Sequence, residues 1–147
     1  MMKKELINIG NKSKKAINSQ INSKKKNKVL NDYCDLIKKN KKLIINQNKK
    51  DIFDAQNKGL KSNLIDRLIL DEKKISIIIN SIKSIIKLKD PTNIILEKWK
   101  RSNGLNISKI SIPIGIIGII YESRPNVTSD VASLCFKSGN AVILKGG

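Results

Sequence analysis

Apolar residues recur three or four positions apart through most of the first ninety residues, with lysines between them. The clearest stripe is Ile75, Ile78, Ile79, Ile82 and Ile86, and a second is Leu30, Tyr33, Cys34, Ile37 and Ile44. This spacing predicts helices that turn an apolar side to the core and a lysine side to solvent. Gly59 and the Asp90-Pro91 pair are typical helix stops, so residues 1–91 are predicted to be a helical region.

The periodicity changes at about residue 92. Segments 93–100 and 105–112 partly alternate apolar and polar residues, and Asn103-Gly104 between them is a strong signal for a tight turn. We predict an antiparallel β-hairpin over residues 92–112. A two-stranded ribbon is marginally stable alone. The hairpin is therefore either an arm that pairs with another subunit or a ribbon folded back on its own domain.

Residues 113–147, PIGIIGIIYESRPNVTSDVASLCFKSGNAVILKGG, contain two apolar runs, 114–121 and 140–147, that are typical of strands covered on both faces in a parallel sheet. The segment 127–139 between them places one set of apolar residues on one side of a helix: Val127, Val131, Leu134 and Cys135. Strand, helix and strand form a βαβ unit, the usual opening of a doubly wound nucleotide-binding domain. The predicted fold class is α/β.

Ligands of such sheets bind beyond the carboxyl ends of the strands, which here are residues 121–126 and 145–147. Arg124 lies in the first of these segments. Its planar guanidinium could pair with a phosphate or a substrate carboxylate, and an ion pair with Glu122 or Asp130 is the alternative.

The net charge of +18 suggests a polyanionic partner, but the amino-acid composition of the chain indicates another origin for this charge. Of the 30 basic residues 27 are lysine, and lysine, isoleucine and asparagine, all encoded by A/T-rich codons, are over-used together. The lysines are scattered, and five aromatic residues are too few for base stacking. A basic nucleic-acid-binding protein is therefore the less favoured alternative.

The chain has no histidine, which excludes a histidine triad, zinc site or general base in this sequence. Cys34 and Cys135 do not form a metal-binding spacing, so no metal is expected. The N-terminus lacks the apolar core of a secretory signal. The apolar run 112–121 is far shorter than the roughly 20 residues of a membrane span. We expect a reduced cytoplasmic protein without a membrane segment.

Three stretches, YESRPNVT, KSGNAVILKGG and, less strictly, DIFDAQNKGLKSNLIDRLIL, resemble the gamma-glutamyl phosphate reductase family (glutamate-5-semialdehyde dehydrogenases) of the aldehyde dehydrogenase superfamily. The resemblance covers essentially the whole chain. It implies that residues 113–147 begin an NADP-binding domain. It also implies NADPH-dependent reduction of L-glutamyl 5-phosphate to the semialdehyde in proline biosynthesis.

The resemblance also implies roles for single residues. Lys145, with Gly146 beside it, matches the lysine that reaches the adenosine ribose, where its charge would suit the 2′-phosphate of NADP; a solvated strand-end lysine is the alternative. Asn126 takes the place of the asparagine whose amide holds the developing oxyanion, and a helix cap is its alternative. For Arg124 the resemblance implies a role in binding the substrate.

In this family a cysteine thiolate attacks the acyl phosphate, and the resemblance implies that this cysteine lies beyond residue 147. Cys34 and Cys135 belong to apolar stripes, where thiols are usually buried and inert. Two parallel strands with one helix also leave apolar faces and edges uncovered. We therefore expect a partial chain that is inactive alone. A retained fragment that assembles through the hairpin 93–112 is a further alternative.

Overall fold

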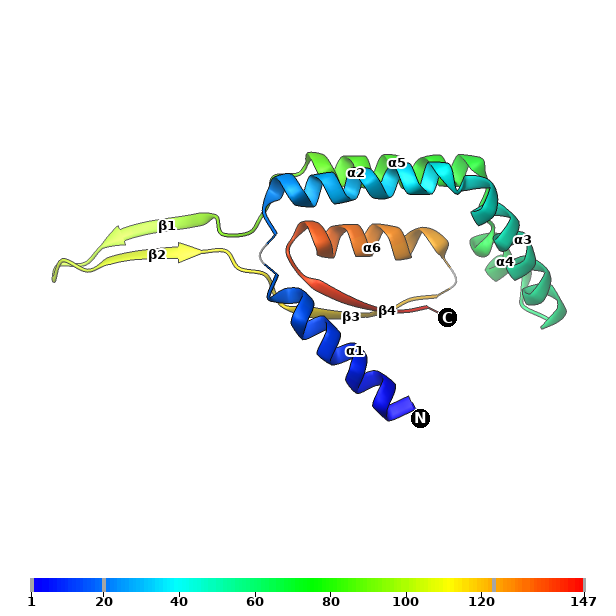
Figure 1. Ribbon diagram of the computed structural model, residues 1–147, viewed down its shortest axis with the longest axis horizontal. Helices are drawn as coiled ribbons and strands as arrows, with labels where there is room; N and C mark the ends of the chain where they lie inside the picture. Colours follow the sequence, from blue (N-terminus) through cyan, green and yellow to red (C-terminus); the bar gives the residue numbers. More distant parts are fainter. Residues whose placement is uncertain (1, 20, 123, 147) are drawn as a thin grey trace.

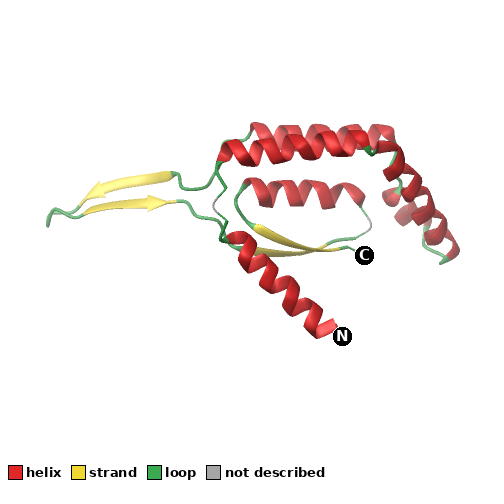
Figure 2. Cartoon of the chain, viewed as in Figure 1, coloured by secondary structure: helices red, strands yellow, loops and turns green. Residues whose placement is uncertain are grey.

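The computed structural model describes residues 2–19, 21–122 and 124–146 (Figure 1). Within them the elements are α1 Met2–Ile17, α2 Ser23–Lys39, α3 Lys41–Asn57, α4 Ser62–Leu68, α5 Glu72–Lys87, β1 Ile95–Lys100, β2 Asn106–Ile110, β3 Ile116–Ile120, α6 Pro125–Lys137 and β4 Ala141–Lys145. Figure 2 shows a layer of helices, a small sheet beneath it and a hairpin that projects away from both. The predicted α/β fold class is confirmed. Ser123 and Gly147, which belong to the two predicted strand-end segments, lie outside the described residues.

The core lies between α2, α5 and α6, which run side by side (Figure 1). Its buried members are Leu30, Cys34, Ile37, Leu70, Ile75, Ile78, Ile79, Ile82 and Ile85. Burial of each large aliphatic side chain contributes about 1.5–3 kcal/mol. The two predicted apolar stripes therefore face the core, although Tyr33, Ile44 and Ile86 are only partly buried and Ile85 is buried in addition. Ile44 lies on α3, separate from the rest of its stripe on α2.

Local polar contacts fix where these helices begin and end. The side chain of Asn22 accepts a hydrogen bond from the Lys25 amide (2.9 Å) at the start of α2, and Asp71 accepts one from the Lys74 amide (2.6 Å) at the start of α5. Gly59 has a φ of +71°, and its amide donates to the Gln56 carbonyl (2.9 Å) beyond the end of α3. The predicted stop at Gly59 is confirmed, because a left-handed residue here satisfies the last carbonyls.

The hairpin forms as predicted, although its strands are shorter than the predicted segments. β1 pairs antiparallel with β2, and the connecting turn places Gly104 at a φ of +87°. Beyond pairing with each other, β1 and β2 make no extensive contact with another described element, and they project from the rest of the molecule (Figure 1). The alternative of a ribbon folded back on its own domain is wrong, and the hairpin is an arm.

The βαβ unit is confirmed: β3 and β4 are parallel and paired from Ile116↔Ala141 to Ile120↔Lys145, with α6 connecting them. Helix α6 lies over one face of the sheet and α1 over the other (Figure 1). Both helices contact mainly β4. Ile116 and Ile120 of β3 are exposed, so this strand is not covered on both faces as its apolar run predicts, whereas the uncovered apolar faces expected of two strands with one helix are present. Leu134 was predicted on the apolar side of its helix, and that prediction is wrong, because its side chain is 47% exposed on α6.

Two lysines are buried, and Lys26 among them departs from the solvated helix faces predicted for residues 1–91. Lys26 of α2 and Lys137 of α6 are each only 3% exposed. A buried ammonium is tolerated only with close polar partners, so each marks a specific contact between elements. Within the described ranges, none of the helices is both long and apolar enough to cross a membrane.

Candidate active site

The carboxyl ends of the two parallel strands lie side by side, as expected of a βαβ unit. The amide of Tyr121, which follows β3, donates to the carbonyl of Lys145 at the end of β4 (3.1 Å). The loop that enters α6 and the segment after β4 therefore meet at one edge of the sheet. This edge faces away from the hairpin arm, toward the end of the molecule that α3 and α4 form (Figure 1).

An open cavity of about 930 Å³ lies at this edge. Its floor comes from the strand ends and the start of α6, and its wall from α3 and α4. The charged residues that line it are Asp51, Asp54, Lys58, Glu122 and Arg124, and Gly146 lines it as well. This volume lies in the range of pockets that hold cofactors and small substrates.

Arg124 lies at the N-cap position of α6, exposed to solvent, and lines the cavity. The alternative ion pair with Glu122 or Asp130 does not form: the Glu122 carboxylate instead contacts Arg67 of α4 (3.5 Å), and Asp130 accepts a hydrogen bond from Asn126. None of the ion pairs in the described part of the chain includes Arg124. Its fork of donors is thus placed where an anion in the cavity could be bound.

Asn126 lies inside the first turn of α6, where its amide nitrogen donates to Asp130 Oδ2 (3.2 Å). The helix-cap alternative for Asn126 is wrong, because the helix begins one residue earlier, at Pro125. Proline suits that first position, since its ring fixes φ and it has no amide to leave unpaired. Asn126 does not line the cavity, so its predicted oxyanion role stays a prediction.

Gly146 lines the cavity, whereas Lys145 does not. The Lys145 ammonium is exposed and donates to the Gly146 carbonyl. The Tyr121 hydroxyl lies against Gly146, 3.5 Å from where a Cβ would stand, and it contacts the Thr128 hydroxyl (2.5 Å). The structure thus brings together Arg124, Gly146 and Tyr121, whereas Lys145 contacts Gly146 from outside the lining. The cofactor role of Lys145 stays a prediction.

Both cysteines are buried, as predicted, and neither lines this cavity. Burial raises the pKa of the Cys135 thiol, and it also raises that of Cys34 against the opposing effect of the Lys38 and Lys83 charges. Both thiols are thereby kept protonated, the opposite of what a nucleophilic cysteine requires. In the described part of the chain, no group of three or more acidic, cysteine or histidine residues forms a metal site.

We expect both thiols of the folded chain to resist Ellman's reagent, because only an exposed thiolate attacks it. Two thiols should react after unfolding in urea. A folded chain whose two thiols reacted as fast as free cysteine would contradict the buried positions of Cys34 and Cys135.

The α3–α4 wall of the cavity was not predicted. Asn48, buried on α3, donates to the Leu68 carbonyl (2.9 Å) and accepts from the Leu70 amide (2.7 Å), which fixes the link between α4 and α5. The contact of Arg67 with Glu122 then ties α4 to the strand-end loop. The sequence signal that could have predicted this contact is Asn48 itself, a polar residue four positions after Ile44 and therefore on the same side of the helix.

Similarity to known proteins was found at the level of both sequence and structure. The chain is 51% identical over 131 residues to the gamma-glutamyl phosphate reductase of Nautilia profundicola, an alignment that covers 89% of this chain and 32% of the relative. It is 47% identical over 148 aligned residues to the reductase of Clostridium tetani, an alignment that covers 99% of this chain and 35% of the relative. The chain resembles the N-terminal third of gamma-glutamyl phosphate reductases. The resemblance inferred from YESRPNVT and KSGNAVILKGG is thereby confirmed.

Solved structures of gamma-glutamyl phosphate reductases have the same fold over this region. The enzyme from Thermotoga maritima superposes with a TM-score of 0.93 at 38% identity, over 97% of this chain and 35% of that protein. The Saccharomyces cerevisiae enzyme superposes with a TM-score of 0.90 at 33% identity, over 95% of this chain and 36% of that protein. The chain thus spans about a third of the length of the reductases it matches. No protein-family model matches the chain.

Proposed function

We propose that this chain forms the N-terminal part of a gamma-glutamyl phosphate reductase. That enzyme would reduce L-glutamyl 5-phosphate with NADPH to glutamate 5-semialdehyde and release phosphate, in proline biosynthesis. The observation that carries the proposal is the close likeness to such reductases over nearly the whole chain, at a TM-score of 0.93. The two buried free thiols suit a reducing cytoplasm.

The strand-end cavity is the part of this chain that would contribute to catalysis. NADPH, when bound, supplies the hydride. The residues present fit the cofactor, since an exposed ammonium at Lys145 is available to a 2′-phosphate and Gly146 leaves backbone room at the same strand end. Arg124 would hold the substrate carboxylate or the phosphate. The Asn126 amide, which lies outside the cavity lining and donates to Asp130, would turn toward the substrate to stabilise the developing oxyanion.

Neither cysteine of this chain would be the nucleophile. Their buried positions and raised thiol pKa values support this, as does their absence from the cavity lining. The attacking thiolate would come from the part of the enzyme that has no counterpart in these 147 residues. We therefore expect the chain alone to be inactive.

The hairpin arm would serve assembly with a second copy of the chain. It carries exposed apolar side chains, including Leu96, Trp99, Leu105 and Ile110. Both outer edges of the two-stranded ribbon have backbone groups without a further strand as partner. Exposed edges of this kind commonly pair with another chain.

These proposals are best tested in a chimera in which this chain is followed by the part of the Nautilia profundicola reductase beyond the matched region. In the chimera, Lys145→Ala is expected to raise the Michaelis constant for NADPH about tenfold and that for NADH much less, because one charge-assisted hydrogen bond is lost. The control is Lys100→Ala, an exposed lysine at the end of β1. Equal changes for the two cofactors would remove the 2′-phosphate role of Lys145.

A further inference from the structure

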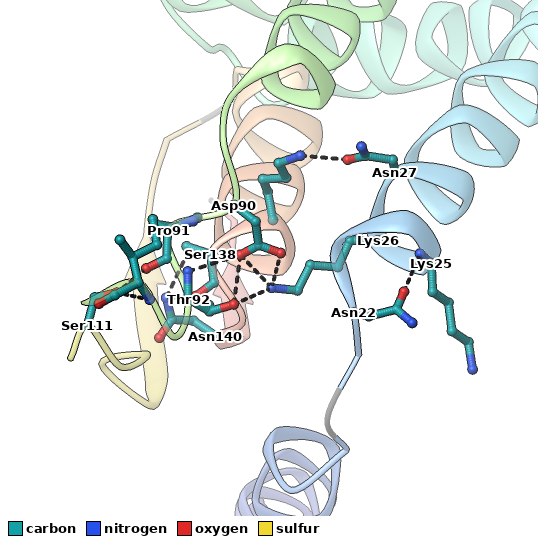
Figure 3. A network of polar contacts seen from close by, with 12 residues as sticks. Asn22, Lys25, Lys26, Asn27, Asp90, Pro91, Thr92, Ser111, Ser138 and Asn140 are labelled. Atoms are coloured by element: carbon teal, nitrogen blue, oxygen red, sulfur yellow. Dashed lines mark hydrogen bonds and ion pairs between the residues drawn. The ribbon is translucent and has the colours of Figure 1, made fainter. Parts of the chain in front are cut away.

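The base of the hairpin arm is held by a buried ion pair that links it to α2. The Lys26 ammonium donates to both carboxylate oxygens of Asp90 (3.0 and 2.9 Å) and to the Thr92 hydroxyl (3.2 Å), as Figure 3 shows. Lys26 and Asp90 are 64 positions apart in the sequence. Their contact therefore fixes the segment that enters the arm against the first turn of α2.

Asp90 extends this contact to the arm itself. Its Oδ1 accepts hydrogen bonds from the Thr92 amide (3.0 Å) and the Thr92 hydroxyl (2.7 Å). Burial by itself would raise the pKa of the Asp90 carboxyl, but the hydrogen bonds from Lys26 and Thr92 outweigh it and hold that pKa below its usual value. Asp90 is thus a charged acceptor with several donors converging on it.

The two sides of the arm are also joined to each other. The Ser111 hydroxyl, where the chain leaves the arm, donates to the Pro91 carbonyl (2.5 Å) and accepts from the Ile94 amide (3.0 Å) (Figure 3). The entering and leaving segments therefore form one unit. An orientation imposed on Asp90 and Thr92 is transmitted to both strands.

The other face of this base rests on the turn between α6 and β4. Gly139 has a φ of +74°, and a Cβ there would lie 2.9 Å from Thr92 Cγ2 and 3.1 Å from Pro113 Cγ. The entering and leaving segments thus contact the glycine backbone closely, which only a residue without a side chain permits. The Asn140 side chain adds a hydrogen bond from the Gly115 amide (2.9 Å).

A second buried lysine fixes the helix from which that turn departs. Lys137, near the end of α6, donates to the Asn27 side chain (2.6 Å) and to the Ile86 carbonyl (3.0 Å). Since Asn27 follows Lys26 on α2, the same turn of α2 holds both the arm base and the end of α6. The support of the arm is therefore continuous with the core.

We propose that Lys26 is a positioning residue, which holds the hairpin arm at a fixed angle to the βαβ unit through Asp90 and Thr92. Apolar residues can replace a buried ion pair without loss of stability, but they do not supply its directional hydrogen bonds. The consequence for assembly rests on the proposed pairing of the arm with a second copy. The angle of the arm itself is a property of one chain and can be measured separately.

The test measures the distance distribution between spin labels at the arm tip and on α5, by double electron–electron resonance in the 147-residue chain. Labels are placed at Ser102→Cys and Ser84→Cys, both exposed positions, and labelled chain is diluted with unlabelled chain. The buried native thiols are checked for background labelling in the chain without added cysteines. The test variant is Lys26→Met combined with Asp90→Leu. The matched control is Lys28→Met with Asp32→Leu, an exposed pair on the same helix at the same 2.9 Å separation.

We expect the distribution to broaden about twofold in the test variant and to stay unchanged in the control, because only the buried network is directional. Thr92→Val keeps the contact with Gly139 but loses the hydroxyl, and it should broaden the distribution less. Unchanged distributions in a folded test variant and in Thr92→Val would overturn the proposal. Sedimentation of the same samples reports assembly. A wild-type chain with a narrow distribution but no self-association would refute the assembly role and leave the positioning role supported.

Discussion

Replacing Lys26 with methionine is expected to lower the free energy of unfolding by about 3–5 kcal/mol, because it leaves the Asp90 carboxylate buried without its partner. The side chains of Lys26 and Asp90 are 4% and 14% exposed, so solvent cannot compensate for the lost contact. The double variant with Asp90→Leu should recover most of this loss, since it removes the unpaired charge. Urea unfolding followed by circular dichroism measures each value.

The control for this prediction is Lys28→Met, which breaks the exposed pair with Asp32 and should cost no more than about 1 kcal/mol. The pH dependence provides a second check. Because the folded-state pKa of Asp90 is lowered, its stabilising effect is present above the unfolded pKa of about 4 and disappears as the pH falls through the folded value. The double variant should therefore lose less stability in acid. Equal costs for the Lys26 and Lys28 variants would contradict the account of this buried pair.

Arg124→Gln in the chimera is expected to lower kcat/KM for the oxidation of glutamate 5-semialdehyde by about 10- to 100-fold, since a charge-assisted, bidentate contact contributes about 1.5–3 kcal/mol. Arg124→Lys keeps the charge but loses the planar fork, and an intermediate value is expected. The Michaelis constants for semialdehyde and phosphate show which anion the guanidinium binds. A rise in the first indicates the substrate carboxylate, and a rise in the second indicates phosphate.

The matched control is Arg101→Gln, an exposed arginine at the turn between β1 and β2. This hairpin projects away from the ends of β3 and β4, at which the cavity lies (Figure 1). It should leave both Michaelis constants unchanged. If Arg124→Gln behaved like the control, Arg124 would have no part in binding substrate or phosphate.

Local sequence signals were sufficient for several elements of the fold. The spacing of Ile75, Ile78 and Ile82 predicted the buried side of α5, and Asn103-Gly104 predicted the hairpin turn. The glycines and β-branched residues after Pro113 predicted the parallel pair of strands. These features depend on residues close together in the chain, so periodicity and turn chemistry define them.

What the sequence did not predict depends on contacts between distant segments. Lys26 is one of many lysines, and only its partner 64 positions away makes it a buried residue. The α3–α4 wall of the cavity depends on Asn48, whose hydrogen bonds cross to a segment 20 and 22 positions away. The pattern predicts a helix that begins after Asn126, whereas α6 begins at Pro125, because an Arg-Pro step suits a turn as well as the start of a helix.

The most direct test of the central proposal is the rate of NADP reduction with glutamate 5-semialdehyde and phosphate, measured for three proteins side by side. These are the 147-residue chain, the downstream part of the Nautilia profundicola reductase alone, and the chimera of the two. We predict turnover in the chimera only, unchanged by Cys135→Ala and abolished when the nucleophilic cysteine of the downstream part is replaced. A folded chimera without turnover, or turnover by the 147-residue chain that Cys135→Ala abolished, would contradict the proposed function.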